Sequence, residues 1–133
     1  MTQRSAAREV FHTEKAPAPV AAYSQACASG PILSVAGQVG IDPATAEIAT
    51  GGAGPQTEQA LRNLDAVLAA AGASREDVIR MDCYLTTADH LAAFNEVYAG
   101  WFPAPAPPAR TTVIVGLADG LLVEVTALAV RQG

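Results

Sequence analysis

Short apolar runs bounded by glycine, proline and polar residues predict six β-strands along the chain. Turn signals such as Ser29-Gly30-Pro31 separate them. The proline-rich stretch at 103–108 is predicted to be a loop, because proline lacks the backbone N–H that regular structure uses. The predicted strands cover residues 9–12, 23–28, 32–36, 78–86, 111–115 and 122–130.

Two other stretches repeat apolar residues every three to four positions, which is the period of an amphipathic helix. The first covers about 55–71 and ends at Gly72. The second is capped by Thr87 or Asp89 and stops at Pro103. Core packing is the simplest role for its apolar face, which consists of Leu91, Phe94, Tyr98 and Trp101.

The resulting order β-β-β-α-β-α-β-β predicts one α+β domain over residues 1–133, with a single sheet and both helices on one of its faces. Residues 1–8 are expected to form a flexible extension. The other face of the sheet would remain open, although the last two strands carry too many apolar side chains to face water together. We therefore expect self-association to bury this face. The apolar residues assigned to it are Ile114, Leu122, Leu128 and Val130.

Composition limits what the protein can bind. Half of the residues (50%) are hydrophobic but only 5% are aromatic, so a monomer would have a thin core. The net charge of −5 argues against nucleic acid, which needs a basic surface. No apolar run is long enough for a membrane span and the N-terminus is too polar for a signal peptide, so a cytoplasmic location is expected. Cys27 and Cys83 lack the spacing of a metal or redox site and are expected to be reduced core residues.

Two charged residues, Arg110 and Glu124, lie within otherwise apolar strands. A charge in such a place is costly unless it is paired or holds a charged ligand. Two interpretations are open. In the first, the two residues form a salt bridge or lie at an exposed edge. In the second, Arg110 grips a substrate carboxylate and Glu124 orients water or moves a proton.

Motifs of other catalytic classes are absent from the sequence. There is no P-loop, G-x-S-x-G, H-E-x-x-H or G-x-G-x-x-G segment. His12 and His90 are predicted at a strand end and in the first turn of a helix, where a solvated role is the simpler interpretation. Tyr23 is open to two interpretations, a core residue with a satisfied hydroxyl or a lid on a pocket.

Five segments, taken in their order, resemble the RidA family (YjgF/YER057c/UK114) of enamine/imine deaminases, and the resemblance covers nearly the whole chain. The most specific are Pro108-Ala109-Arg110-Thr111-Thr112 and the final strand, Val123 to Val130, which contains Glu124. The other segments are Ala16-Pro17 through Tyr23-Ser24-Gln25-Ala26, Val35-Ala36-Gly37-Gln38 and Phe94-Asn95-Glu96-Val97-Tyr98.

The resemblance implies a chorismate-mutase-like fold, a mixed sheet with two helices on one face that assembles into a homotrimeric barrel with the helices outside. The family's sites lie in clefts between subunits, so Arg110 of one subunit would work beside Tyr23 of a neighbour. Position by position, Arg110 matches the arginine that binds the substrate carboxylate, and Glu124 matches the glutamate that helps place the hydrolytic water. Gly37 would line the cleft, and Asn95 would give structural support.

Three positions depart from the best-studied members of the family. Thr112 replaces a common cysteine, Ala36 replaces a common serine, and Ala21-Ala22 replaces the usual Gly-Pro before Tyr23. Backbone groups at Thr112 can still serve the substrate nitrogen. The hydroxyl missing at Ala36 bears on the choice of substrate more than on the chemistry.

The implied reaction is hydrolysis of a C=N bond. Arg110 would hold the carboxylate of a 2-imino acid such as 2-iminopropanoate, the tautomer of 2-aminoacrylate, while water held by Glu124 attacks the imine carbon; ammonia and a 2-oxo acid leave. Positioning and proton management suffice for this step, so no metal, nucleophile or cofactor is implied. Three alternatives stay open: a deaminase of a different enamine in a catabolic pathway, a non-catalytic trimer that binds carboxylate metabolites, and RNA cleavage, which the acidic charge disfavours.

Overall fold

The computed structural model describes residues 8–132. Its strands and helices follow the predicted order, and most of their ends lie within two residues of the predicted ends. The expected N-terminal extension falls, apart from Arg8, on residues 1–7, outside the described part. The elements are β1 (Glu9–Phe11), β2 (Ala26–Ser29), β3 (Ile32–Val39), α1 (Ala53–Ala70), β4 (Val78–Leu85), α2 (Leu91–Trp101), β5 (Ala109–Ile114) and β6 (Val123–Val130).

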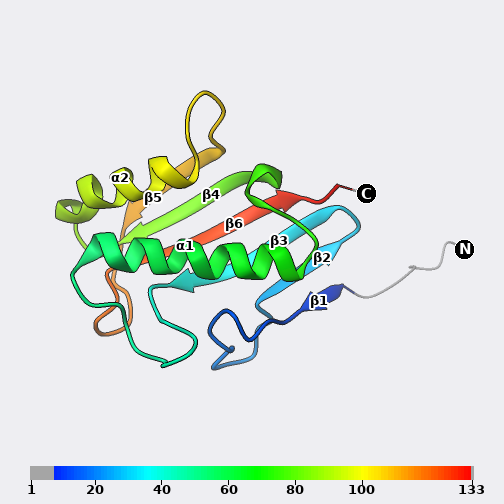
Figure 1. The fold of residues 1–133 in the computed structure, drawn as a ribbon, viewed down its shortest axis with the longest axis horizontal. Coiled ribbons are helices and arrows are strands. Elements are labelled where there is room, and N and C mark those ends of the chain that lie inside the picture. Colours follow the sequence, from blue (N-terminus) through cyan, green and yellow to red (C-terminus); the bar gives the residue numbers. More distant parts are fainter. Residues whose placement is uncertain (1–7, 133) are drawn as a thin grey trace, which may run out of the picture.

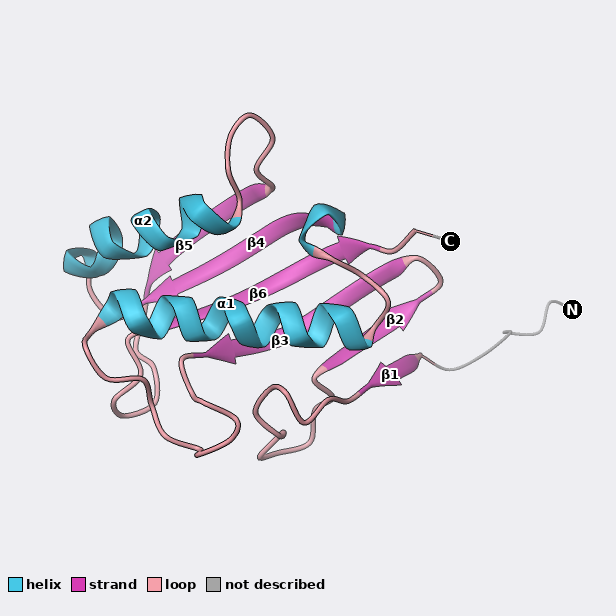
Figure 2. Ribbon diagram, viewed as in Figure 1, coloured by secondary structure: helices cyan, strands magenta, loops and turns pink. Residues whose placement is uncertain are grey.

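The six strands form one mixed sheet in the order β1-β2-β3-β6-β4-β5, so β1 and β5 are its edges. β4 and β5 pair in parallel, and α2 supplies the crossover connection that a parallel pair requires. The other neighbouring strands pair antiparallel. Both helices lie on the same face of the sheet (Figures 1 and 2), which confirms the predicted two-layer arrangement.

The core lies between the helices and the sheet. α1 packs on β3 and β6 and buries the leucines of its predicted apolar face completely. Along β6 the odd-numbered residues from Val123 to Ala129 are buried, whereas Glu124 and the alternate residues after it are half-buried. The alternation separates a face covered by helices from an open face, as the strand period requires.

The open face carries Leu128 and Val130 as predicted, but two other assignments are wrong. Ile114 pairs with Leu85, which is fully buried, so its side chain lies on the helix side at the sheet edge. Leu122 precedes β6 and packs against the core. Alternation within a strand fixes which residues share a face, but the register with neighbouring strands decides which face that is. Cys27, expected in the core, is half-buried, whereas Cys83 is buried as expected; both are free thiols.

β2 begins at Ala26 and not at the predicted Tyr23, because the preceding loop is organised around a buried glutamine. Gln25 is 2% exposed, and its side-chain amide donates to the carbonyls of Ala16 and Pro17 and exchanges two hydrogen bonds with the backbone of Thr13. These bonds fix the loop, and Tyr23 therefore lies outside the sheet.

The remaining boundaries differ for local reasons. β3 continues past the predicted end to Val39 through an irregularity between Val35 and Gln38. The N-cap of α2 is His90, which makes no side-chain cap hydrogen bond, so neither Thr87 nor Asp89 caps this helix directly. Thr87 caps the short 3-10 helix Ala88–His90 that leads into α2, because its Oγ1 accepts a hydrogen bond from the Asp89 N–H at 3.3 Å. Within residues 8–132, neither helix is long and apolar enough to cross a membrane.

Candidate functional site

Arg110 lies near the start of the edge strand β5 and is half-buried against α2. Its Nη2 donates to Asn95 Oδ1 at 2.8 Å. Its Cζ lies 4.7 Å from the ring centroid of Tyr98 and 5.4 Å from that of Phe94. Phe94 and Tyr98 are one helical turn apart, so both rings face the same guanidinium. The contacts hold the side chain against the helix.

Arg110 has no carboxylate within ion-pair distance among the described residues, although three other arginines inside the fold do. The structural interpretation of a salt bridge with Glu124 is therefore wrong. Arg110 pairs with the buried Met81 and so lies on the helix side of the sheet, whereas Glu124 pairs with Tyr84 on the open face. A half-buried cation without a counter-charge is suited to binding an anion.

Two titratable groups near Arg110, the Cys83 thiol and the Tyr98 hydroxyl, are neutral at pH 7. Burial raises the pKa of the Cys83 thiol to about 12, and burial raises that of the Tyr98 hydroxyl to about 12, so both are neutral at pH 7. The Thr112 hydroxyl, on the same face of β5, is buried and has no hydrogen-bond partner among residues 8–132. β5 is an edge strand, and part of its backbone N–H and C=O groups point away from β4.

Glu124 lies on the open face, with its carboxylate over the backbone of Gly37. A Cβ at Gly37 would come within 2.9 Å of Glu124 Cδ, so glycine leaves the space that the carboxyl group occupies. The side chain makes no hydrogen bond or ion pair within residues 8–132. Burial without a compensating charge raises the pKa of this carboxyl above its ordinary value.

The loop that carries Tyr23 is fastened next to this carboxylate. The Ala36 N–H donates to the Gln25 carbonyl at 2.9 Å, and Gly37 follows in the irregular part of β3. Tyr23, two residues before Gln25, is 48% exposed. The interpretation of Tyr23 as a core residue is therefore wrong, and its side chain is available for contacts outside its own fold.

The structure thus sorts the predicted site residues into two groups. Arg110, Asn95 and Thr112 lie on β5 and α2, on the helix side of the sheet. Tyr23, Ala36, Gly37 and Glu124 lie around β3 and β6, with the glutamate on the open face. β4 separates β5 from β6, so a single chain does not bring the two groups together. We name them the arginine group and the glutamate group.

A groove of about 730 Å³ lies elsewhere, between the ends of both helices and the proline-rich loop. It contains none of the predicted site residues. Its arginine, Arg75, is paired with Asp65 at 3.2 Å and lies over the Trp101 ring, so it offers no free positive charge.

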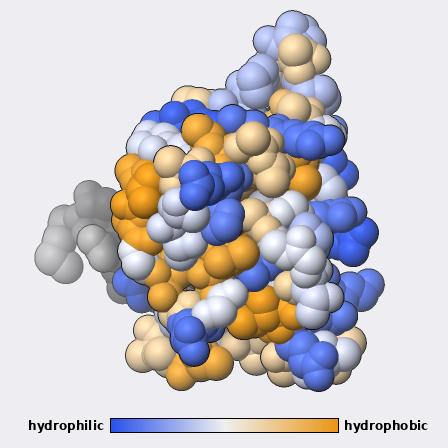
Figure 3. All heavy atoms as spheres, turned by 90° about the vertical axis from the view of Figure 1, so that its left-hand side faces the viewer, coloured by the Kyte–Doolittle hydropathy of each residue, from blue (hydrophilic) through white to orange (hydrophobic). Residues whose placement is uncertain are grey.

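Figure 3 shows the end of the molecule that carries the N-terminal ends of the helices, where apolar and polar areas are mixed. Within residues 8–132, no three His, Cys, Asp and Glu side chains cluster so that they could hold a metal ion.

Sequence reasoning treated Phe94 and Tyr98 as core packing. Both are indeed buried, at 0% and 6% exposure, but they also touch Arg110. Helical spacing showed that the two rings share a face. Helical spacing alone does not predict that β5 places the Arg110 guanidinium against that face.

Comparison with known proteins places the chain among relatives over nearly its full length. The sequence model of the family described as "Endoribonuclease L-PSP" matches residues 13–131. A RutC family protein from Pyrococcus horikoshii is 44% identical over 94% of this chain and 99% of its own length. A 2-iminobutanoate/2-iminopropanoate deaminase from Rattus norvegicus is 34% identical over 93% of this chain and 90% of its own length.

Solved structures have the same fold. RidA from the Antarctic bacterium Psychrobacter sp. PAMC 21119 is 38% identical, with a TM-score of 0.87 over 92% of this chain and 99% of that one. TdcF from E. coli, solved with bound serine, is 31% identical, with a TM-score of 0.88 over 93% and 99% of the two chains. The chain therefore belongs to the RidA/YjgF family, the L-PSP group that also contains the RutC proteins.

Proposed function

We propose that the protein is a hydrolytic deaminase of reactive 2-imine and 2-enamine carboxylates, of the 2-iminopropanoate/2-aminoacrylate type. The observation that carries the proposal is the state of Arg110, a half-buried cation that is held in place by Asn95 and two aromatic rings and has no counter-charge within residues 8–132. Arginine binds a carboxylate through two parallel N–H donors, which fixes both the position and the orientation of a small acid.

Glu124 is proposed to manage the water and the protons. The carboxylate takes a proton from water as the water oxygen adds to the imine carbon, and the C=N electron pair moves to nitrogen. The proton is then returned to nitrogen, which gives a carbinolamine. Glu124 next takes the hydroxyl proton and passes it to the same nitrogen, the C–N bond breaks, and the O–H electrons form the carbonyl of the 2-oxo acid as ammonia leaves. The raised pKa of Glu124 favours its return of the proton, because a carboxyl group with a pKa nearer neutrality exchanges protons more readily.

The two groups are proposed to meet between subunits of a homotrimer. The arginine group lies at a sheet edge, and the glutamate group lies on and beside the open face, where Leu128 and Val130 are only half-buried and Ile32 is 48% exposed. Packing of this face against a neighbouring copy would bury apolar surface. It would also place Arg110 of one subunit beside Tyr23 and Glu124 of the next.

The other predicted residues take supporting roles in this proposal. Asn95 orients Arg110, Thr112 presents backbone groups of the edge strand to the substrate nitrogen, and Gly37 gives room to Glu124. Ala36 contributes a methyl group where a hydroxyl is common among relatives, which favours a less polar substrate side chain. The name of the Rattus norvegicus relative and the serine bound to TdcF, itself a small carboxylate, support the substrate class.

The test is imine hydrolysis. 2-Iminopropanoate is generated in situ with an amino-acid oxidase, and its loss is followed without protein, with the wild type, with Arg110→Ala and with Arg62→Ala. Arg62 is an exposed arginine of α1 paired with Glu58, so its variant is a control for loss of one positive charge. The proposal predicts faster loss with the wild type and Arg62→Ala only. Equal decay in all four samples would refute it and would favour an altered substrate or a binding-only protein.

Assembly is tested separately by sedimentation or light scattering. The proposal predicts a particle with three times the 13.6 kDa mass of the chain. Replacing Leu128 by aspartate on the open face is expected to dissociate it and to abolish imine hydrolysis together with assembly. A monomeric wild type with full activity would contradict the shared site.

A further inference from the structure

Tyr98 combines three features that simple core packing does not require. It is 6% exposed, its ring faces the Arg110 guanidinium at 4.7 Å, and its hydroxyl is buried without a hydrogen-bond partner in the described part of the chain, residues 8–132. The hydroxyl is therefore not an anchor for its own side chain. The ring face is the part of Tyr98 that meets a polar group, and that group is the guanidinium.

Aromatic rings hold a cation in a way that differs from a carboxylate. A carboxylate partner takes up N–H donors and cancels the charge, whereas a ring face attracts the guanidinium plane and leaves the N–H groups at its rim unused. The Arg110 guanidinium donates one hydrogen bond to Asn95 and none to Tyr98 or Phe94. Its remaining donors and its charge stay available to a ligand.

We propose that Tyr98 is a positioning residue for the carboxylate site: its ring, together with Phe94, is the floor that fixes the plane of the Arg110 guanidinium, and Asn95 fixes the rotation within that plane. The inference rests on the proposed function, in which Arg110 binds a carboxylate. A long flexible side chain loses conformational freedom on binding, and a side chain that is already fixed loses less. Tyr98 thereby raises carboxylate affinity without touching the carboxylate.

The test compares two substitutions of Tyr98 with a matched control. Tyr98→Leu keeps an apolar side chain and removes the ring, and Tyr98→Phe keeps the ring and removes the hydroxyl. Phe102→Leu removes a neighbouring buried ring, 5.0 Å from the Tyr98 centroid, that makes no cation–π contact with Arg110. The readouts are the Kd of 2-oxobutanoate, a carboxylate that lacks the scissile C=N bond, and kcat and KM for 2-iminopropanoate.

Tyr98→Leu is expected to raise both the Kd and the KM by about 3- to 30-fold, the range of a partly desolvated cation–π contact, with kcat nearly unchanged. Tyr98→Phe and Phe102→Leu are expected to stay within about twofold of the wild-type Kd. Should Tyr98→Leu fail to fold, Tyr98→Met replaces it. The Arg110 Nε–H proton signal is expected to show a ring-current shift in the wild type and in Tyr98→Phe. The shift is expected to be smaller in Tyr98→Leu and Tyr98→Met, in which only the Phe94 ring still faces Arg110.

Two results would overturn the role of Tyr98. An equal loss of affinity in Tyr98→Phe and Tyr98→Leu would assign the effect to the hydroxyl, and an equal loss in Phe102→Leu would assign it to general loosening of α2. Failure of the proposed function can be told apart from failure of the role of Tyr98. If the wild type binds 2-oxobutanoate but does not hydrolyse the imine, the proposed function fails, and the Kd values of the variants still test the role of Tyr98. A wild type that binds no 2-oxobutanoate would overturn both.

Discussion

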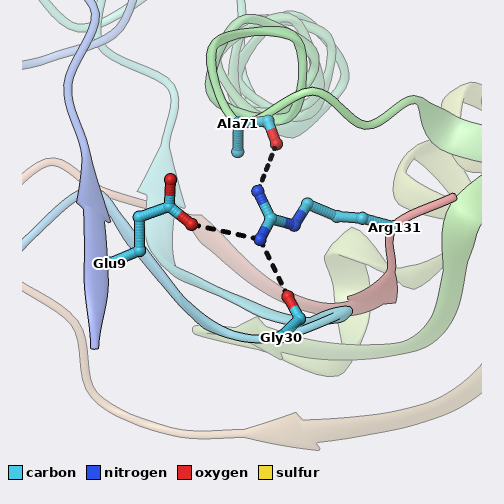
Figure 4. A network of polar contacts seen from close by, with 4 residues as sticks. All are labelled: Glu9, Gly30, Ala71 and Arg131. Carbon is cyan, nitrogen blue, oxygen red and sulfur yellow. Dashed lines mark hydrogen bonds and ion pairs between the residues drawn. The ribbon is translucent and has the colours of Figure 1, made fainter. Parts of the chain in front are cut away.

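Arg131 and Arg110 are both half-buried arginines that lie over aromatic rings, but their surroundings differ. Arg131 donates to the carbonyls of Ala71 at 3.2 Å and Gly30 at 2.8 Å and pairs with Glu9 at 3.2 Å (Figure 4). It also lies 5.3 Å from the Phe11 ring. Among residues 8–132, the Arg110 side chain has a single hydrogen bond, to Asn95. The first arginine is saturated by its own chain, and the second is held in place without being neutralised.

The difference separates a structural arginine from a binding arginine. Arg131 joins the end of α1, the β2–β3 turn and β1, and its charge lies at the negative end of the α1 dipole. The N–H groups of Arg131 already donate to the carbonyls of Ala71 and Gly30 and to the Glu9 carboxylate. Arg110 keeps its donors free at a sheet edge, where another molecule can reach them. Residue type and burial are similar, so the partners decide the role.

The largest expected effect comes from removing the binding arginine. Arg110→Ala is expected to lower kcat/KM for 2-iminopropanoate by roughly 10²- to 10³-fold, because a desolvated carboxylate loses its charged partner. The free energy of unfolding is expected to fall by about 1 kcal/mol or less, since Arg110 makes one side-chain hydrogen bond and two ring contacts but no ion pair within residues 8–132. Steady-state kinetics and urea unfolding measure the two quantities. A large loss of stability with little loss of activity in Arg110→Ala would show that Arg110 is a structural arginine and not a binding one.

Removing the structural arginine is expected to do the opposite. Arg131→Ala breaks two hydrogen bonds to carbonyls and one ion pair with a mostly exposed glutamate, for an expected loss of about 2 kcal/mol in the free energy of unfolding. The Kd for 2-oxobutanoate is expected to remain that of the wild type. Glu9→Gln is the control, with a loss of under about 1 kcal/mol, because an exposed ion pair contributes little. Arg131→Ala with wild-type stability would show that the contacts of Figure 4 do not support the fold.

A smaller effect is expected from a substitution in the glutamate group that moves the Glu124 carboxyl group without unfolding the protein. In Gly37→Ala the new Cβ meets the Glu124 carboxyl group, which is the movable end of a side chain. The carboxylate is therefore expected to shift while the fold persists, with kcat lowered by roughly tenfold and the melting temperature little changed. An unaltered kcat would show that the position of Glu124 over Gly37 is not needed for the reaction.

The pH dependence of stability gives a finer test of Glu124. Because burial raises its pKa, the folded protein binds more protons than the unfolded chain between the ordinary and the raised pKa. The free energy of unfolding contributed by this group therefore falls as the pH rises through that window. Glu124→Gln is expected to be more stable than the wild type at pH 7, and this difference in stability is expected to narrow as the pH is lowered from the raised pKa to the ordinary glutamate pKa. A gap that widens towards acid pH would show that the carboxylate is stabilised in the fold.

The smallest expected effect is on RNA binding, which the family description "Endoribonuclease L-PSP" brings into question. With a net charge of −5, the protein is expected to show no measurable binding to single-stranded RNA even at low salt. Fluorescence anisotropy with a labelled oligonucleotide measures this, and Arg110→Ala is expected to give the same baseline. Binding that weakens steeply with salt would point to a basic surface that the account does not include.

The fold was predictable because periodicity is a local property. Apolar runs and helical spacing predicted the six strands and both α-helices of residues 8–132, but not the short 3-10 helices Arg75–Asp77 and Ala88–His90. The errors arose where distant residues decide the outcome. Gln25 organises its loop through bonds to residues eight to twelve positions away, and the face of Ile114 depends on its register with Leu85. Neither is visible in a single strand's pattern.

The site was predictable in part for the same reason. Arg110 and Glu124 stood out as charges in apolar strands, so their chemistry was visible in the sequence. Their separation onto opposite faces follows from the register against β4, where Arg110 pairs with Met81 and Glu124 pairs with Tyr84. The contact of Tyr98 with Arg110 joins a helix to a strand. Spacing along either element shows burial but not what lies across from it.

The most direct test of the central claim, that Arg110 is an unneutralised cation reserved for a carboxylate, is the Kd of 2-oxobutanoate for the wild type, Arg110→Ala and Arg131→Ala. Calorimetry below the unfolding temperature of each variant measures it without requiring turnover. The account predicts binding by the wild type and Arg131→Ala with similar Kd values, and none by Arg110→Ala. Equal affinity in Arg110→Ala and the wild type would contradict it.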